Sequence, residues 1–451
     1  MDGVPSGVVP LPVARIAIDA YTLAFADFII WLQEIAFMVR LPSFFLRSLP
    51  IVTAATPGAF RIFVITFAMF FIANEEVVAF STQYTLAAFF VMISGIGFST
   101  ILVKAMAEED SVNTFLSYSL SSFVVGGLVS FFILLTVSWF LIIPDFLSLF
   151  LLIASTSVYQ VFRNYLVFKK DFYRLLINDI LIGLFFVACV LSVYFLKGEV
   201  DGSSIFIILS ISYLVSLCAV LIWRYCQACE PPSEDGIALI SKDKTVSSLI
   251  VGLSNAASGG VSFILPSFYA ALGGGEIAVV ASIAALVFSS ISAVPRGVIN
   301  NGTADLSKMI LAKYFDEQFV LRLRRKVRII IAALFPSLTL CVIFYLYAFV
   351  EINNFLASFV FVVALGFYIA TAQLGVVESV MINLCGYERQ AFYFNVVVFL
   401  CVLVVFITSA LFPAMKNASF IVYLLPMLLG GVNIFRMLWY RQLVTRYFAT
   451  A

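Results

Sequence analysis

Three arginines stand inside long apolar segments, where a charged side chain is costly. Arg61 lies between Pro57 and the apolar run FVITFAMFF, and Arg163 and Arg296 lie in two later apolar segments. A central arginine costs about 2.5–3.5 kcal/mol on membrane-insertion scales and usually faces a cavity, although its long stem can also reach the headgroups. The parallel donors of a guanidinium match the geometry of phosphate. These residues therefore predict a cavity for a phosphate-bearing anion.

Two acids and one amide are the other candidates. Asp179 either pairs with Arg163 or Arg174 or adjusts the charge of the cavity. Glu378, in AQLGVVESVMINL, either binds a coupling proton or sodium ion or neutralises an arginine across the cavity. Asn255, in SNAASGG, offers an uncharged hydrogen-bonding group opposite the segment that carries Arg61. We assign substrate binding to Asn255 and the three arginines, and ion coupling or charge tuning to the two acids.

The sequence lacks the residues and motifs that other kinds of chemistry would need. The chain has no histidine, which removes the commonest metal ligand and general base. It has no GxxxxGK[ST] loop, no HExxH and no GxSxG motif. Cys226 and Cys229 have CxxC spacing, but no further pair completes a four-ligand zinc site. We expect no catalytic residues, no metal, no cofactor and no enzyme activity, and the net charge of +1 gives no field that would attract nucleic acid.

The composition indicates what positions these residues. Of the 451 residues, 63% are hydrophobic and 11% charged, against roughly 45–50% and about 25% in soluble proteins. Apolar windows of about 20 residues, each long enough to cross a bilayer, recur along the chain. The expected fold is an all-α integral membrane protein with about twelve transmembrane helices. The predicted spans are 52–74, 77–103, 114–142, 146–167, 175–196, 204–223, 247–272, 277–298, 328–349, 354–383, 391–413 and 418–439.

A polar segment divides the spans into two sets of six. We expect an N-lobe over 49–223, a cytoplasmic linker over 224–245, and a C-lobe over 246–451 that ends in a short cytoplasmic tail. Glu76–Phe80 and Glu276–Val280 have similar sequences and open the second span of each set. Two six-span halves that start from the same side are parallel repeats with pseudo-two-fold symmetry about the membrane normal, an arrangement that commonly places a cavity between the halves.

Residues 1–48 need a separate interpretation because their apolar stretch carries charges. At 100° per residue the charged side chains fall within an arc of about 120°. This pattern predicts an amphipathic helix lying in the membrane interface; a thirteenth span and an overextended start remain alternatives. The charged residues are Arg15, Asp19, Asp27, Glu34 and Arg40.

The distribution of basic residues predicts the orientation. If the chain crosses twelve times with both ends on one side, the opposite side holds only Lys197 and Lys416, and the side with the termini holds the other 24 of 26. Cytoplasmic loops carry such an excess, so both termini are expected in the cytoplasm. The loop between the eighth and ninth spans is the most basic, and we expect it to contact anionic headgroups. Its basic residues are Lys308, Lys313, Arg322, Arg324, Arg325, Lys326 and Arg328.

Several of these features occur together in a known family. Besides the two six-span halves, the second span ends in SGIGFSTILVKAMAEED with Lys104, and the fourth and fifth spans are joined through FRNYLVFKKDFYRLLINDI. LCGYERQAFYFNV, between the tenth and eleventh spans, echoes the latter. Over about residues 50–440 the chain resembles the polysaccharide-transporter branch of the multidrug/oligosaccharidyl-lipid/polysaccharide exporter superfamily, the O-antigen and exopolysaccharide lipid flippases. The 48-residue N-terminal extension departs from the family pattern.

The resemblance implies a function and a location. It implies that an undecaprenyl-diphosphate-linked oligosaccharide, a precursor of O-antigen lipopolysaccharide or exopolysaccharide, is moved by alternating access across a bacterial inner membrane. Arg61, Arg163 and Arg296 would line a cationic cavity, and Glu378 and Asp179 would tune it or couple it to ions. The implied partners are the lipid-linked oligosaccharide, membrane lipids, a polysaccharide polymerase and the chain-length machinery.

Two alternatives remain open. A cation-coupled antiporter of drugs or organic cations belongs to the same superfamily, but it would be expected to carry an acid where Arg61 stands. A membrane-embedded polysaccharide polymerase or ligase would normally need a large extracytoplasmic loop, whereas every predicted loop on that side is short.

Overall fold

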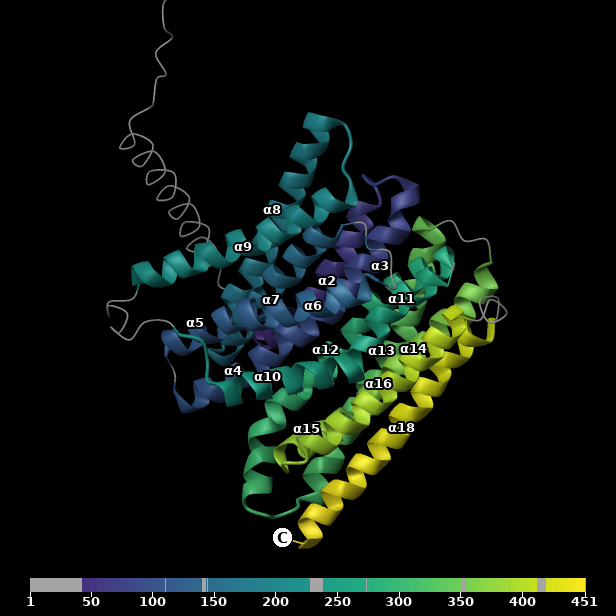
Figure 1. Cartoon of the computed structure of the whole chain (residues 1–451). Helices are drawn as coiled ribbons and strands as arrows, with labels where there is room; N and C mark the ends of the chain where they lie inside the picture. The colour runs from purple at the N-terminus through teal and green to yellow at the C-terminus, as the bar shows by residue number, and fades with distance from the viewer. Residues whose placement is uncertain are drawn as a thin grey trace, which may run out of the picture.

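The computed structural model describes residues 43–450 apart from 110, 140–142, 144, 228–237, 273, 351–353 and 412–418. The described residues form helices and connecting turns, and no strand occurs among them (Figure 1). The helices are α2 (Ser43–Ala68), α3 (Asn74–Val91), η1 (Met92–Ile96), α4 (Gly97–Glu108), α5 (Val112–Ser121), η2 (Ser122–Gly126), α6 (Gly127–Val137), α7 (Phe146–Phe168), α8 (Phe172–Lys197), α9 (Gly202–Gln227), α10 (Lys242–Asn255), η3 (Ala256–Gly260), α11 (Val261–Ala271), α12 (Gly275–Leu311), α13 (Glu317–Phe349), α14 (Phe355–Leu374), α15 (Val376–Leu384), α16 (Glu388–Leu411) and α18 (Ser419–Thr450).

The all-α membrane fold is confirmed. Within the described residues, ten helices are long and apolar enough to cross a membrane, and two shorter apolar helices, Val52–Ala68 and Gly202–Cys218, lie where the first and sixth spans are predicted. Each helix satisfies its own backbone hydrogen bonds, which is why apolar segments of this length are stable in lipid. The count of twelve crossings remains a prediction.

Some of the spans are interrupted. Three short π-helical segments, η1, η2 and η3, lie between α3 and α4, between α5 and α6, and between α10 and α11. One prediction needs correction, because the expected tenth span over 354–383 is not a single helix. It divides at Gly375 into α14 and the short α15, where the amide of Gly375 bonds to the carbonyl of Gln373. Glu378 therefore lies in the first turn of a separate helix.

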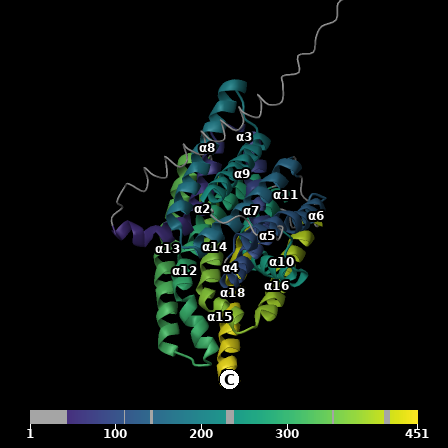
Figure 2. The same ribbon diagram turned by 90° about the vertical axis from the view of Figure 1, so that its left-hand side faces the viewer.

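The helices before and after the polar linker form two sets, here called the N-half (described residues 43–227) and the C-half (described residues 238–450). In Figure 1 the purple to teal helices of the N-half gather on one side of the molecule and the green to yellow helices of the C-half on the other. The halves meet where α2 packs on α12, α3 on α11 and α4 on α10. Figure 2 shows these helices from the side. The lobe boundaries and the pseudo-symmetry remain predictions.

Two glycines allow α4 and α10 to approach closely. A Cβ atom at Gly97 would overlap the carbonyl oxygen of Ser248 and lie 2.8 Å from the Cα of Gly252, and one at Gly252 would overlap the carbonyl oxygen of Ile93. Only glycine leaves room for backbones this close, as in other small-residue contacts between membrane helices. The close approach of α4 and η1 to α10 therefore depends on these two positions.

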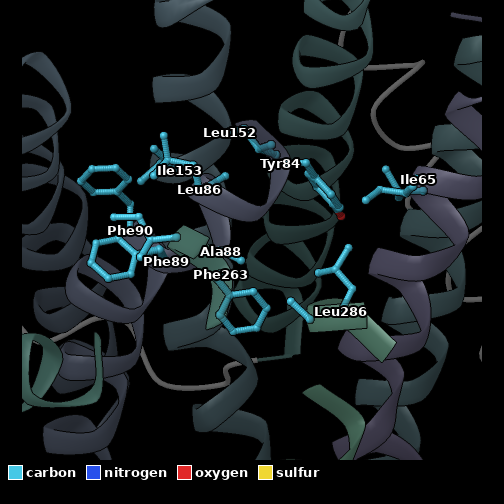
Figure 3. Close-up of a cluster of buried hydrophobic side chains, with 14 of the residues drawn as sticks. Ile65, Tyr84, Leu86, Ala88, Phe89, Phe90, Leu152, Ile153, Phe263 and Leu286 are labelled. Carbon is cyan, nitrogen blue, oxygen red and sulfur yellow. The ribbon is translucent and has the colours of Figure 1, made fainter. Parts of the chain in front are cut away.

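The main apolar core extends across the contact between the halves. Figure 3 shows Ile65, Tyr84 and Phe89 of the N-half beside Phe263 and Leu286 of the C-half. All five side chains are buried. A second, separate core lies within the C-half and holds the ends of α12, α13, α15 and α18 together through buried side chains that include Leu306, Val320, Met381 and Val444.

Two predictions fall partly outside the described residues. The amphipathic helix expected in residues 1–48 overlaps the described residues only from 43 onward, and positions 228–237 of the expected linker are not among them. The cytoplasmic placement of the termini also remains a prediction.

Candidate functional site

Arg163 and Asp179 form a buried ion pair in the N-half. They lie on α7 and α8, and their side chains are 7% and 6% exposed. Nη1 of Arg163 donates to Oδ1 of Asp179 at 2.7 Å and to Oδ2 at 2.6 Å, and Nη2 donates to the carbonyl oxygen of Thr53 at 2.6 Å. The prediction that Asp179 pairs with a neighbouring arginine is confirmed. Arg174 pairs with Asp171 instead, at 2.8 Å.

Neutral groups complete a network around this ion pair. The hydroxyl of Tyr159 donates to Oδ1 of Asp179 and accepts from Nδ2 of Asn178 at 3.2 Å. The hydroxyl of Ser216 donates to the amide oxygen of Asn178, which extends the network to α9. A buried charge pair is tolerated when its remaining hydrogen bonds are satisfied in this way. Direct contact between Arg163 and cargo would require the guanidinium to leave Asp179.

Arg61 has different surroundings. It is partly buried, and its guanidinium carbon lies 5.6 Å from the ring centroid of Phe263 on α11. Among the described residues no carboxylate lies within 4.0 Å of its guanidinium. Arg61 thus points from the N-half toward the C-half and keeps its positive charge uncompensated.

Arg296 of α12 is another arginine inside an apolar span. The apolar stretch Gly275–Ile299 of α12 is the most enclosed of the candidate spans, since 80% of its most apolar 18-residue stretch is buried. Arg296 itself is exposed. Pro295 lies inside α12, which continues through it. Because α12 packs on α2, Arg61 and Arg296 lie on two contacting helices from opposite halves. No carboxylate in the described chain lies within 4.0 Å of Arg296 either.

Glu378 is paired with arginines that the sequence did not single out for this role. Its Oε1 lies 2.8 Å from Nε of Arg324 and 3.0 Å from Nη2 of Arg441, and its side chain is 1% exposed. These partners belong to α13 and α18, so the acid joins three helices within the C-half. It neutralises arginines of its own half and not Arg61 or Arg296. The expectation that the basic loop contacts headgroups therefore needs revision for Arg324.

Asn255 ends α10, where η3 begins, and is partly buried. Its neighbour Ser254 makes the side-chain contact here, because the hydroxyl of Ser254 accepts from Nδ2 of Asn395 at 3.2 Å. The binding role of Asn255 remains a prediction. As for metals, no group of three or more metal-ligating side chains occurs in the described part of the chain.

Sequence reasoning missed three arginines that the fold makes prominent: Arg324, Arg441 and Arg436. The first two are the partners of Glu378, and they lie 54 and 63 residues away from it, so no local spacing could reveal them. Arg436 was visible in the sequence as an arginine inside the predicted span 418–439, three residues before its end.

Comparison with known proteins shows the fold but no close relative. No protein-family model matches the chain, and no curated protein matches it in sequence. An inward-facing multidrug resistance MATE family transporter of the MOP superfamily is similar in structure, with 14% identity, a TM-score of 0.55, and coverage of 93% of this chain and 98% of that one. The eukaryotic MATE transporter AtDTX14 has 12% identity, a TM-score of 0.55, and coverage of 90% and 97%. A MOP superfamily transporter from Pyrococcus furiosus has 14% identity, a TM-score of 0.50, and coverage of 89% and 94%.

The chain therefore has the fold of the MOP-superfamily transporters along almost its full described length. At these identities the likeness concerns the fold, and the charged residues must indicate what the fold is used for.

Proposed function

We propose that the protein is a flippase that moves an undecaprenyl-diphosphate-linked oligosaccharide across a bacterial inner membrane by alternating access, for O-antigen or exopolysaccharide biosynthesis. The observation that supports this proposal is a contrast in charge pairing. Asp179 and Glu378 each form ion pairs with arginines of their own half. Arg61 and Arg296 lie on contacting helices from opposite halves, and neither has an acidic partner within 4.0 Å among the described residues. Uncompensated cations between two halves favour an anionic cargo.

The physical task explains the arrangement. A diphosphate and its sugars cannot cross about 30 Å of hydrocarbon unaided, because their polar groups would lose hydration. Arg61 and Arg296 would replace that hydration with fixed positive charge, and Asn255 would supply a neutral hydrogen bond. The isoprenoid tail remains in the bilayer while the halves rock to expose the site to each side in turn. Both termini would remain cytoplasmic, and a polymerase with chain-length machinery would use the product outside.

The two buried acids would act on the arginines that bind them. Asp179 holds Arg163 in the interior of the N-half, and Glu378 holds Arg324 and Arg441 in the C-half. In this proposal they set the net charge and rigidity of each half, and any ion coupling would occur through changes in these pairs.

A drug or organic-cation antiporter is the second candidate. The structural similarity favours it, since two of the structures named above are described as MATE transporters. The charge pairing argues against it, because a cationic cargo would require an available acid. The Pyrococcus furiosus transporter is described as having a binding pocket of reverse polarity that suggests a different function. One fold thus accommodates pockets of opposite sign.

Transport of a lipid-linked sugar also differs from its polymerisation. The third candidate, a polymerase or ligase, would change the length of the glycan, and a flippase would not. A reconstituted protein that leaves the chain length of the lipid-linked sugar unchanged would support transport without catalysis.

The test compares cells that lack the protein with cells that carry its variants. Deletion should cause lipid-linked oligosaccharide to accumulate in the inner leaflet, and the native gene should restore delivery to the outer leaflet. Arg61→Ala should fail to restore it, and Arg61→Lys should restore only part, because lysine keeps the charge but loses the fork of donors. Arg389→Gln, which removes an exposed cation at the start of α16, is the matched control.

Two outcomes would overturn the proposal. Unchanged outer-leaflet delivery after deletion would remove the flippase assignment. Full activity of both Arg61 variants, together with drug sensitivity on Glu378→Gln, would favour the cation antiporter.

A further inference from the structure

A polar pocket is lined entirely by residues of the C-half. It is formed where the segment around η3 meets α14, α16 and α18. Most of its lining is apolar, but Ser258, Tyr368, Asn395, Asn433 and Arg436 bring polar groups into it. A small number of placed polar groups in an apolar surround is typical of a ligand site.

Arg436 is the charged group of this pocket, and its partners are neutral. Its Nη1 donates to the amide oxygen of Asn395 at 3.1 Å. In the described chain no carboxylate lies within 4.0 Å of it, unlike Arg163, Arg324 and Arg441. The arginine lies within the last candidate span, Ile421–Ala449. An ionisable residue there marks a functional site more often than a structural one.

The neutral groups around Arg436 are held in place by other bonds. Nδ2 of Asn395 donates to the hydroxyl of Ser254 at 3.2 Å, and Nδ2 of Asn433 donates to the carbonyl oxygen of Tyr368 at 3.1 Å. The hydroxyl of Tyr368 donates to the carbonyl oxygen of Ser258 at 3.4 Å. These bonds fix the geometry without cancelling the positive charge, so the pocket is organised around an unneutralised cation.

The size of the pocket limits what can enter. It has room for about one water-sized group, which excludes a sugar ring but admits a single oxygen of a phosphoryl or carboxylate group. We propose that this pocket, with Arg436 held by Asn395, is an anion subsite that takes one oxygen of a phosphoryl or carboxylate group. The oxygen could come from the cargo of the proposed function or from an anionic lipid headgroup, and only that choice of source rests on the proposed function.

The first experiment measures binding of inorganic pyrophosphate to the purified full chain in zwitterionic nanodiscs. The native protein should bind it, and Arg436→Gln should weaken binding at least about tenfold. Asn395→Asp is the sharper variant, because it puts a carboxylate where the amide oxygen now lies 3.1 Å from Nη1 and should compete with the ligand while leaving Arg436 in place. Arg389→Gln, on the same helix as Asn395 but exposed, should bind as the native protein does.

The second experiment identifies the source of the anion. Undecaprenyl diphosphate and phosphatidylglycerol are each added as competitors of pyrophosphate, and the competitor that loses its effect in Arg436→Gln is the occupant. Equal pyrophosphate binding by the native protein, Arg436→Gln and Asn395→Asp would overturn the subsite, as would no binding to the native protein. If the native protein binds and the variants do not, while deletion leaves outer-leaflet delivery intact, the subsite stands and the flippase proposal fails.

Discussion

The guanidinium carbon of Arg61 lies 5.6 Å from the ring centroid of Phe263, and the two residues belong to opposite halves of the molecule. The face of an aromatic ring attracts a cation without neutralising it, so the contact holds Arg61 in place and leaves its charge available. An acid at position 263 would have removed that charge. The relationship thus links the contact between the halves to the cation that we assign to cargo binding.

A double-mutant cycle should measure this contact. Arg61→Gln and Phe263→Leu should show a coupling free energy of about 0.5–2 kcal/mol. Either single variant already removes the cation–π contact, so the double variant loses no further contact energy. The measurement is chemical denaturation of the purified protein. Arg61→Gln combined with Phe268→Leu is the matched control. Phe268 lies in the same helix as Phe263, but its ring stacks on Phe406 of α16. Coupling of equal size in both cycles would contradict the interpretation.

The buried pair in the N-half should be costly to break. Asp179→Asn leaves the Arg163 cation uncompensated and should lower the free energy of unfolding by about 3–5 kcal/mol. The double variant Arg163→Met with Asp179→Leu should recover most of this loss, because no buried charge remains. Asp171→Asn removes the acid of a pair whose side chains are 37% and 23% exposed, and it should cost less than about 1 kcal/mol. Similar costs for Asp179→Asn and Asp171→Asn would be inconsistent with the burial described.

The glycine contact between α4 and α10 makes a steric prediction. Gly252→Ala and Gly97→Ala add a methyl group against the backbone of the facing helix, so each should destabilise the protein by about 1–3 kcal/mol. The measurement is thermal unfolding in detergent. Gly127→Ala and Gly431→Ala are the controls, because a Cβ at either position meets nothing within 4 Å and alanine favours the helix. Destabilisation by the controls as large as that of the contact variants would show that the approach of α4 to α10 is not the cause.

Cys385 provides a pH-dependent test at the turn after α15. Burial raises the pKa of its thiol to about 11, above the ordinary value of about 8.5. The thiolate is the reactive form, so alkylation of folded protein should accelerate about tenfold per pH unit up to pH 10 without levelling off. The measurement uses a variant in which Cys385 is the only cysteine, and denatured protein, whose rate should level off near pH 9, is the control. Levelling at the same pH in the folded protein would contradict the burial of the thiol.

Local features of the chain predicted most of the secondary structure. The predicted span 175–196 lies inside α8 (Phe172–Lys197), and 146–167 nearly coincides with α7 (Phe146–Phe168), because an apolar run of this length has few alternatives to a helix. The error at 354–383 has a local cause as well. Gly375 ends α14 within an apolar stretch, where hydropathy alone gives no boundary.

The candidate site was less predictable. The pairing of Asp179 with Arg163 was among the sequence alternatives, since the two residues lie 16 positions apart on successive helices. The partners of Glu378 were not, because Arg324 and Arg441 approach it only when α13, α15 and α18 pack together.

The amino-acid sequence by itself determined that this chain is a helical membrane protein and that it carries arginines at membrane depth, because hydrophobicity and span length are properties of local segments. Only the tertiary structure decided which of those charges are neutralised. Charge pairing depends on distances of a few ångströms between helices that are remote in the chain, so Arg163 and Glu378 became internal pairs while Arg61, Arg296 and Arg436 kept charge that no described carboxylate balances at close range.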